Sequence, residues 1–438
     1  MSTAEFDIES LTRSARGGNA DAQYRLAALS IGQQQVEEGL TWLRKAAANN
    51  HRDARFTLAN FYLRGEFVPQ DVGKALTLIQ QLHRAGYAAA SQELSSMMAN
   101  GFGMERDWAG ALDILLDSAL EGRVGAMREL ALLLILSGVE DALAHDLLMA
   151  AATRNDIHSA MVLTARLIAG DERISRSAIA FWLAGAQELG YPLAGHYRTF
   201  IDEPASDKAP AHSDIPTFET KALKLVLLKP EGGNLGKHET LYDRPVIRRT
   251  DNAIPQELCD YIIGYAAPGL QPAAWFNPQS SQWEADPLRR CMTRIFLPID
   301  QPLTITAVTA RMTAAADSAV GCSELPTVLF YKPGQEYQPH LDVMPEEIAV
   351  SEVEAARGGQ RVKTAVLYLN DTYSGGEIHF MRADKSLTPK KGAILVYDNL
   401  LSDGTIDEQA LHEGKPVTLG EKWVMSLSIR GGIFSLLG

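Results

Sequence analysis

Six alanines recur at nearly regular intervals over the first 200 residues of this chain. Successive members of the set are 32, 36, 36, 34 and 34 residues apart, at Ala22, Ala54, Ala90, Ala126, Ala160 and Ala194. A period of this length is typical of stacked helix pairs, each of which buries its apolar face against the next pair. Glycines that can end a helix recur between the units, as in Ala85-Gly86-Tyr87 and Leu189-Gly190-Tyr191. The spacing therefore predicts an α-helical repeat solenoid over residues 1–200.

The rest of the chain has a different character. Residues 201–216 are polar, contain three prolines and lack an apolar period, which predicts a linker. Residues 217–438 are then expected to form a second domain, beginning with a strand over 222–228. Helical apolar spacing follows over 255–263, and a further helix is expected over 305–319. The predicted fold class is a multidomain α + β protein.

The composition restricts the class of protein and the cellular compartment expected for this chain. Of 438 residues, 46% are hydrophobic and 22% charged, as in ordinary soluble globular proteins. No run approaches the ~20 apolar residues that a membrane-spanning helix needs, and the acidic start lacks the pattern of a secretory signal. Three widely spaced cysteines argue against a disulfide framework and for a reducing, cytoplasmic compartment. The net charge of -13 disfavours nucleic acid as a partner.

A candidate metal site lies in the second domain. His340 and Asp342 are two residues apart, so in a strand both side chains point to the same side and can bind one ion together. One distant histidine would complete two imidazoles and one carboxylate, the ligand set of non-haem Fe(II) oxygenases. His412 is the candidate for that third ligand. His379 is the competing candidate, but it lacks a strand pattern with a lysine ten residues further on.

Lys422 begins a second informative segment, Lys422-Trp-Val-Met-Ser-Leu-Ser-Ile-Arg430. Its alternation places Lys422, Ser426 and Ser428 on one face, and apolar side chains on the other, which suits a strand of a small barrel or jelly roll around a site. A lysine on the inner face requires an anion, such as a dicarboxylic co-substrate. The alternative is a lysine on an edge strand in water.

Further motifs fall in one order between Thr327 and Arg430. They are Gly334-Gln335-x-Tyr337-x-x-His340-x-Asp342, Gly358-Gly359-Gln360-Arg361-x-x-Thr364, Gly375-Gly376-Glu377-x-x-Phe380, Pro389-x-Lys391-Gly392 and Leu411-His412-x-x-x-Pro416-Val417-x-x-Gly420-x-Lys422-Trp423. With these motifs the segment resembles the catalytic domain of the prolyl 4-hydroxylases, within the 2-oxoglutarate- and Fe(II)-dependent oxygenases. The repeats resemble Sel-one-like repeats, which are related to tetratricopeptide repeats.

The resemblance implies a double-stranded β-helix, or jelly roll, with supporting helices. It implies Fe(II) bound by His340, Asp342 and His412, with 2-oxoglutarate and O2 as co-substrates and ascorbate as an additional cofactor. Lys422 would anchor the distal carboxylate of 2-oxoglutarate, and the residues expected around that co-substrate are Tyr331, Thr364, Tyr368 and Ser426. Arg361 matches a position that helps to hold a peptide near the iron. The implied activity is hydroxylation of a prolyl residue in a protein or peptide, with the repeats as a docking platform.

Two departures from the family pattern bear on the substrate. Ile378 stands where the family usually has threonine, and Ser428 where an aromatic residue is expected. Another peptidyl side chain or a free amino acid therefore stays open as substrate. A different class of function also stays open, namely a repeat scaffold with a degenerate, non-catalytic oxygenase domain. The aromatic and methionine positions of the repeats are expected to pack between helices rather than to bind a ligand.

Overall fold

The computed structural model describes residues 3–436 apart from 205–207, 234, 278–281 and 350. Residues 205–207 of the predicted linker thus lie outside the described residues. The chain divides into two compact units, Met1–Ile114 and Leu115–Gly438. Among the described residues, no helix is both long enough and apolar enough to cross a membrane.

The first unit is built from helices of the predicted repeats. They are α1 (Thr3–Arg16), α2 (Ala20–Gly32), α3 (Val36–Ala48), α4 (Arg52–Arg64), α5 (Val72–Arg84) and α6 (Ala88–Asn100), followed by the start of α7 (Trp108–Leu120). Side chains of Asn19, His51 and Asp71 accept hydrogen bonds from the first turns of α2, α4 and α5. The repeat residues Ala54 and Ala90 are fully buried, so small side chains occur where helices pack closely.

The second unit continues the helical repeats before the sheets begin. Its helices are α8 (Val124–Ser137), α9 (Asp141–Ala152), α10 (Ile157–Ile168), α11 (Arg176–Glu188), α12 (Ala194–Arg198), α13 (Thr220–Leu227), α14 (Gln256–Ala266), α15 (Leu303–Ala315), α16 (Glu346–Ala349) and α17 (Glu352–Ala356), with 3-10 turns at Ala267–Gly269 and Glu408–Ala410. The predicted strand over 222–228 is wrong, because α13 occupies this segment. Leu223 and Leu227, one helical turn apart, are its buried residues, so a short apolar run was consistent with either structure.

Two antiparallel sheets form the expected jelly roll. The larger has the order β1 (Glu239–Asp243), β2 (Val246–Thr250), β13 (Ile394–Asp398), β9 (Arg361–Tyr368), β16 (Lys422–Arg430), β7 (Thr327–Tyr331), β6 (Met292–Ile295) and β3 (Gln271–Pro272). The smaller has the order β12 (Lys385–Leu387), β11 (Ile378–Phe380), β14 (His412–Gly414) and β8 (Tyr337–His340). Two short pairs complete the set, β4 (Ala274–Asn277) with β5 (Gln282–Ala285) and β10 (Ser374–Gly375) with β15 (Val417–Leu419). The predicted fold class, with helical repeats before a sheet domain, is confirmed.

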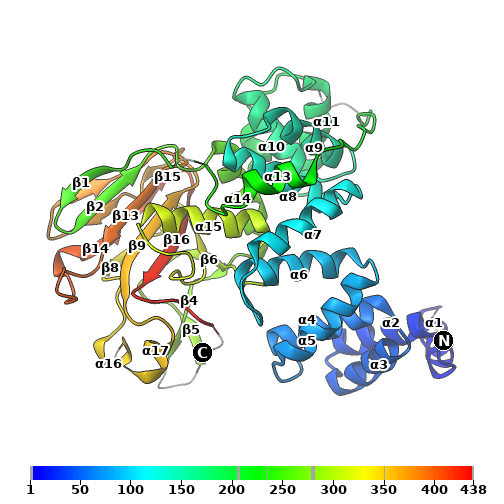
Figure 1. Ribbon diagram of the computed structural model, residues 1–438. Coiled ribbons are helices and arrows are strands. Elements are labelled where there is room, and N and C mark those ends of the chain that lie inside the picture. Colours follow the sequence, from blue (N-terminus) through cyan, green and yellow to red (C-terminus); the bar gives the residue numbers. More distant parts are fainter. Residues whose placement is uncertain (1–2, 205–207, 234, 278–281, 350, 437–438) are drawn as a thin grey trace. The chain divides into compact units, whose positions relative to one another are not determined.

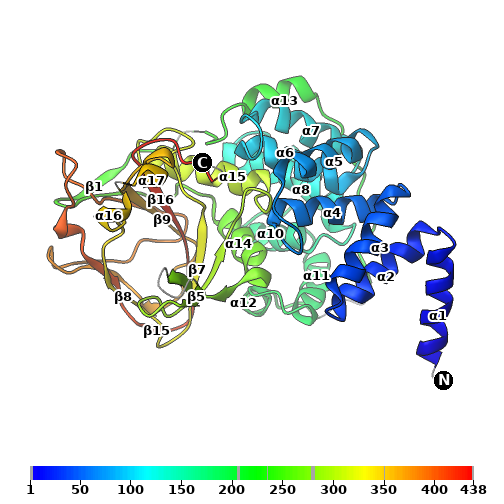
Figure 2. The same cartoon turned by 90° about the horizontal axis from the view of Figure 1, so that it is seen from below.

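Helices α14 and α15 lie between the larger sheet and the repeat helices α8 and α10 (Figures 1 and 2). At Gly264 of α14, a Cβ atom would stand 1.8 Å from the Tyr191 hydroxyl oxygen, so this contact has room only for glycine. The later repeats are therefore packed directly onto the helices that support the sheet.

A buried carboxylate joins the same elements. Glu129 of α8 is 3% exposed and accepts hydrogen bonds from the Tyr261 hydroxyl at 2.8 Å, the Thr304 hydroxyl at 2.6 Å and the Thr304 amide at 3.1 Å. Its neighbour Arg128 lies 3.4 Å away and also pairs with Asp156. Glu129 thus accepts hydrogen bonds at the first turn of α15 and from α14, which ties a repeat helix to both support helices.

Replacement of this carboxylate tests the connection. Glu129→Ala leaves two buried hydroxyls and a buried amide without their acceptor, and we expect it to lower the free energy of unfolding by about 3–5 kcal/mol. Calorimetry measures the loss, and Glu188→Ala on the exposed end of α11 is the control. Equal stability of the two variants would contradict the role given to Glu129.

Candidate active site

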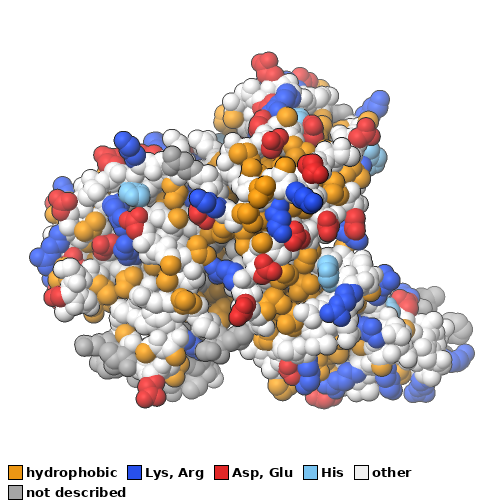
Figure 3. All heavy atoms as spheres, in the orientation of Figure 1, with side chains coloured by type: hydrophobic (Ala, Val, Ile, Leu, Met, Phe, Trp, Pro, Cys, Tyr) orange, Lys and Arg blue, Asp and Glu red, His pale blue; other side chains and the backbone are white. Residues whose placement is uncertain are grey.

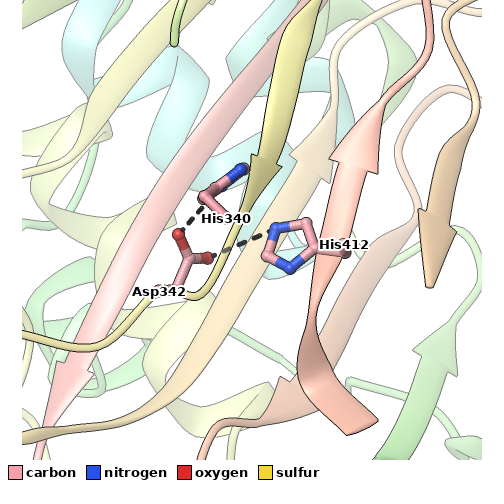
Figure 4. Close-up of side chains that lie close together, drawn as sticks. All are labelled: His340, Asp342 and His412. Carbon is pink, nitrogen blue, oxygen red and sulfur yellow. Dashed lines mark ion pairs between the residues drawn. The ribbon is translucent and has the colours of Figure 1, made fainter. Parts of the chain in front are cut away.

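The smaller sheet brings the predicted metal ligands together. His340 is the last residue of β8 and His412 is the first of β14, and the register of this antiparallel pair places them directly opposite each other. Asp342 follows two residues after the end of β8. One ligand atom from each of the three side chains lies within 4.8 Å of the others. Figure 4 shows both imidazoles beside the Asp342 carboxylate.

Hydrogen bonds fix which nitrogen each imidazole presents. His340 Nδ1 lies 2.7 Å from the Gln338 carbonyl oxygen, and His412 Nδ1 lies 2.9 Å from the Ala410 carbonyl oxygen. A carbonyl can only accept, so each ring carries a proton on Nδ1 and turns its Nε2 atom toward Asp342. The Nε2 atoms of His340 and His412 lie 3.3 Å and 3.8 Å from the Asp342 oxygens.

The protonation states suit a divalent cation. Burial alone would raise the pKa of the Asp342 carboxyl, but hydrogen bonding to His340 and the nearby His412 ring hold that pKa well below its usual value. Burial lowers the pKa of His412 to about 4, so its imidazole is neutral at physiological pH. Two imidazoles held by carbonyls and one carboxylate match the donor set and outer-shell support of a non-haem Fe(II) site.

A cavity of about 290 Å³ extends from these three residues between the two sheets. Its lining includes four of the five residues predicted to surround the co-substrate, Tyr331, Tyr368, Lys422 and Ser426. Strand pairing explains the grouping, because Lys422 of β16 is opposite Tyr331 of β7 and Val424 is opposite Tyr368 of β9. The candidate metal ligands and the candidate co-substrate residues therefore share one cavity.

Lys422 is a buried cation in this cavity. It is 6% exposed, and its Nζ donates to the Gly376 carbonyl oxygen at 2.7 Å. The same atom lies 5.4 Å and 5.8 Å from the ring centroids of Tyr331 and Tyr368. Burial lowers the pKa of Lys422 to about 8. A carbonyl and two ring faces do not neutralise an ammonium, so the site favours an anion that enters the cavity.

Thr364 lies outside the cavity lining, unlike the other residues predicted to surround the co-substrate. It is 1% exposed, and its hydroxyl accepts a hydrogen bond from Asn399 at 3.2 Å. Val366 and Tyr368, at the same period of two along β9, do line the cavity, and so does Tyr397, which is opposite Thr364 on the neighbouring strand.

Arg361 lines the cavity, but its guanidinium is paired within the chain. Its Nε and Nη2 donate to the two carboxylate oxygens of Glu324 at 2.7 Å and 2.9 Å. Glu324 also accepts from Arg430, which in turn pairs with Glu354 at 3.0 Å. A contact between Arg361 and a substrate is thus limited to the guanidinium atoms that Glu324 leaves free.

His379, the competing ligand candidate, lies elsewhere. It sits on β11 opposite Glu413, and its Nδ1 is 3.0 Å from the Ser386 hydroxyl. It is not among the three residues whose ligand atoms converge.

Three residues at the site were not anticipated, two of which, Arg289 and Tyr397, line the cavity, while Asn399 lies behind Asp342. Arg289 donates to the Tyr337 hydroxyl at 2.8 Å and lies 4.7 Å from that ring's centroid. The Tyr397 hydroxyl donates to Asp342 at 2.6 Å, and Asn399 donates to the Asp342 carbonyl at 3.3 Å. Tyr397 could have been predicted from the alternation of its strand, because it lies on the same inward face as Leu395. Asn399 follows at the same period of two but beyond the end of the strand, and Arg289 had no periodic signal.

Comparison with known proteins agrees with this geometry. Residues 326–430 match the family model of the 2OG-Fe(II) oxygenase superfamily. A probable prolyl 4-hydroxylase of Arabidopsis thaliana is 28% identical over 191 residues, which cover 39% of this chain and 64% of that relative. The chain thus spans slightly less than two thirds of this curated relative.

Two solved structures are also similar. A viral collagen prolyl hydroxylase of Paramecium Bursaria Chlorella virus-1 is 25% identical with a TM-score of 0.34, over 42% of this chain and 95% of that chain. The protective antigen c5321 of uropathogenic Escherichia coli, which has an SLR fold, is 25% identical with a TM-score of 0.36, over 43% of this chain and 42% of that chain. Residues 326–430, which carry the whole candidate metal site and Lys422, form a domain of the 2OG-Fe(II) oxygenase superfamily with homologues among the prolyl 4-hydroxylases.

Proposed function

We propose that this chain is a 2-oxoglutarate- and O2-dependent Fe(II) hydroxylase that acts on a prolyl residue of a protein or peptide. One observation carries the proposal: His340, Asp342 and His412 converge at a cavity whose lining also holds the buried ammonium of Lys422. A metal-binding group and a buried lysine ammonium in one small cavity suit a co-substrate that has a chelating end and an anionic end.

The roles of the chain's residues follow from their positions. His340, Asp342 and His412 would hold Fe(II), which when bound supplies the activation of O2 and the oxidative decarboxylation of 2-oxoglutarate to succinate and CO2. Lys422 binds the distal carboxylate of 2-oxoglutarate, and the hydroxyls of Tyr331 and Ser426 supply hydrogen bonds in the same cavity. The apolar lining from Val366, Ile378 and Val424 excludes water from the reacting atoms.

The choice of substrate rests on the relatives and on the mouth of the cavity. The matched relative is named a probable prolyl 4-hydroxylase. Leu288 and Leu325 line the cavity together with the Arg361–Glu324 pair, so an uncharged aliphatic ring meets apolar side chains and a neutralised ion pair there. Another peptidyl side chain or a free amino acid is the alternative substrate. Ascorbate as reductant and a cytoplasmic location belong to the same proposal, on the family resemblance and the cysteine content.

The repeats are proposed to dock the protein that carries the target residue. In the Met1–Ile114 unit, a cavity of about 680 Å³ is lined by His83, Arg84, Met98, Met104 and Arg106 among others. Acidic and basic side chains are interspersed on the face drawn in Figure 3, so a partner recognised there would meet mixed charge rather than one sign. The rival function, a non-catalytic scaffold, would use these repeats without metal.

A turnover assay distinguishes the proposed hydroxylase from a non-catalytic scaffold. With Fe(II), 2-oxoglutarate, ascorbate and proline-containing peptides, we expect succinate formation coupled to a peptide mass gain of one oxygen atom. His412→Ala removes a candidate ligand and should abolish both signals, whereas His379→Ala, on the neighbouring strand, should retain them. Equal activity in His412→Ala would contradict the assigned ligand, and incorporation into a residue other than proline would favour the alternative substrate.

The pKa of Lys422 predicts how co-substrate affinity depends on pH. Only the protonated lysine attracts the distal carboxylate, and burial places its pKa at about 8 in the free protein. The Kd for 2-oxoglutarate should therefore be constant below that pH and rise about tenfold per pH unit above it. Lys422→Arg keeps a charged group over this range, so its Kd should stay flat even if it is weaker. If the Kd of the parent protein did not rise above this pH, the proposal that Lys422 binds the distal carboxylate would be wrong.

A further inference from the structure

Asp342 is the one candidate ligand that no strand holds. The two histidines belong to β8 and β14, whose ladder fixes their backbones, whereas Asp342 lies in the segment after β8. A carboxylate on such a segment can turn about its side-chain bonds, and it can offer a cation one oxygen or two. Its orientation must therefore come from other contacts.

Strand β13 and the residue after it supply those contacts. Tyr397 donates its hydroxyl proton to Asp342 Oδ2 at 2.6 Å, and Asn399 donates Nδ2 to the Asp342 carbonyl oxygen at 3.3 Å. Tyr397 and Asn399 are both 1% exposed. Tyr397 is fixed by its pairing with Thr364 on β9 and Ile247 on β2, and its ring packs edge-on against Phe380 at 5.2 Å.

Asn399 is anchored as firmly. Its backbone amide donates to the Val362 carbonyl at 2.9 Å, and its carbonyl accepts from the Asp407 amide at 2.9 Å. The second proton of its side-chain amide goes to the Thr364 hydroxyl at 3.2 Å. Tyr397 therefore holds the carboxylate of Asp342 while Asn399 holds its backbone, and Thr364 supports Asn399.

The Tyr397 hydroxyl has one proton and two neighbouring acceptors. His412 Nε2 lies 3.1 Å from the phenol oxygen, and its lone pair is free because the ring proton is on Nδ1. The shorter contact gives the proton to Asp342. A cation on His412 Nε2 would use that lone pair, which leaves Asp342 Oδ2 as the acceptor for the phenol.

We propose that Tyr397 is a positioning residue for the metal, which occupies Asp342 Oδ2 by a hydrogen bond and leaves Oδ1 as the single oxygen offered to the cation. This inference rests on the proposed function, because it assumes that the three residues bind a metal. A one-oxygen carboxylate keeps more coordination positions open for a chelating co-substrate and O2 than a two-oxygen carboxylate does. Loss of such an outer-shell partner typically lowers metal affinity by about 10–100-fold.

The test is anaerobic titration of the full chain with Mn(II), which binds such sites without turnover. Tyr397→Phe keeps the ring and its packing but removes the hydroxyl. We expect its Kd for Mn(II) to rise by about 10–100-fold. Tyr373→Phe is the matched control, because it removes a buried phenol hydroxyl that has no hydrogen-bond partner among the described residues. Its Kd should equal that of the parent.

A second readout separates positioning from general support of the fold. The visible bands of bound Co(II) report coordination number, so they should change in Tyr397→Phe, where both Asp342 oxygens become available, and not in Tyr373→Phe. Unchanged affinity and unchanged bands in Tyr397→Phe would overturn the inference while leaving the metal site intact. A parent protein that binds neither ion would overturn the metal site itself, and with it the inference.

Discussion

The pairing of β8 with β14 is the constraint on which the site depends. It places His412 opposite His340 although the two residues are 72 positions apart in the sequence, from 340 to 412. Side chains alternate along a strand, so a shift of the register by one residue would turn one imidazole to the opposite face of the sheet. The rest of the smaller sheet, through β11 beside β14, and the carbonyls of Gln338 and Ala410 hold this register and the ring orientations.

The charged residues around the cavity fall into two groups, those paired with an opposite charge of the chain and those in contact with other groups. Arg361, Arg430, Glu324 and Glu354 neutralise one another within the chain. Lys422 instead contacts a carbonyl and two ring faces, and Asp342 contacts the Tyr397 hydroxyl and the two imidazoles, so neither is held by an arginine–carboxylate pair. Burial of such groups lowers stability unless something binds them, and apolar residues of similar size would pack there at lower cost. Asp342 and Lys422 therefore mark where the metal and the anionic co-substrate are proposed to bind.

Local periodicity explains what the sequence could predict. The repeat period and the alternation of Lys422 and Ser426 each describe one element, and the structure contains those elements. The strand predicted to carry both His340 and Asp342 ends at His340, yet the two side chains still converge. The segment 222–228 shows the limit, because one pair of leucines fits a helix turn or a strand. Contacts between distant segments could not be predicted, because no local pattern in the sequence reports them. The Glu324–Arg361 pair, the Tyr397 contact to Asp342 and the packing of α8 on α15 through Glu129 all depend on tertiary structure.

The most direct test of the account is an anaerobic titration of the full chain with Fe(II) and 2-oxoglutarate, followed by the visible charge-transfer band of an iron-chelated keto acid. The account predicts a band that saturates near one iron per chain, disappears in His412→Ala and is weakened in Lys422→Ala. Such a result would place the metal and the co-substrate in the same cavity. The absence of a band from the parent protein would contradict the oxygenase assignment and favour a scaffold that acts through its repeats.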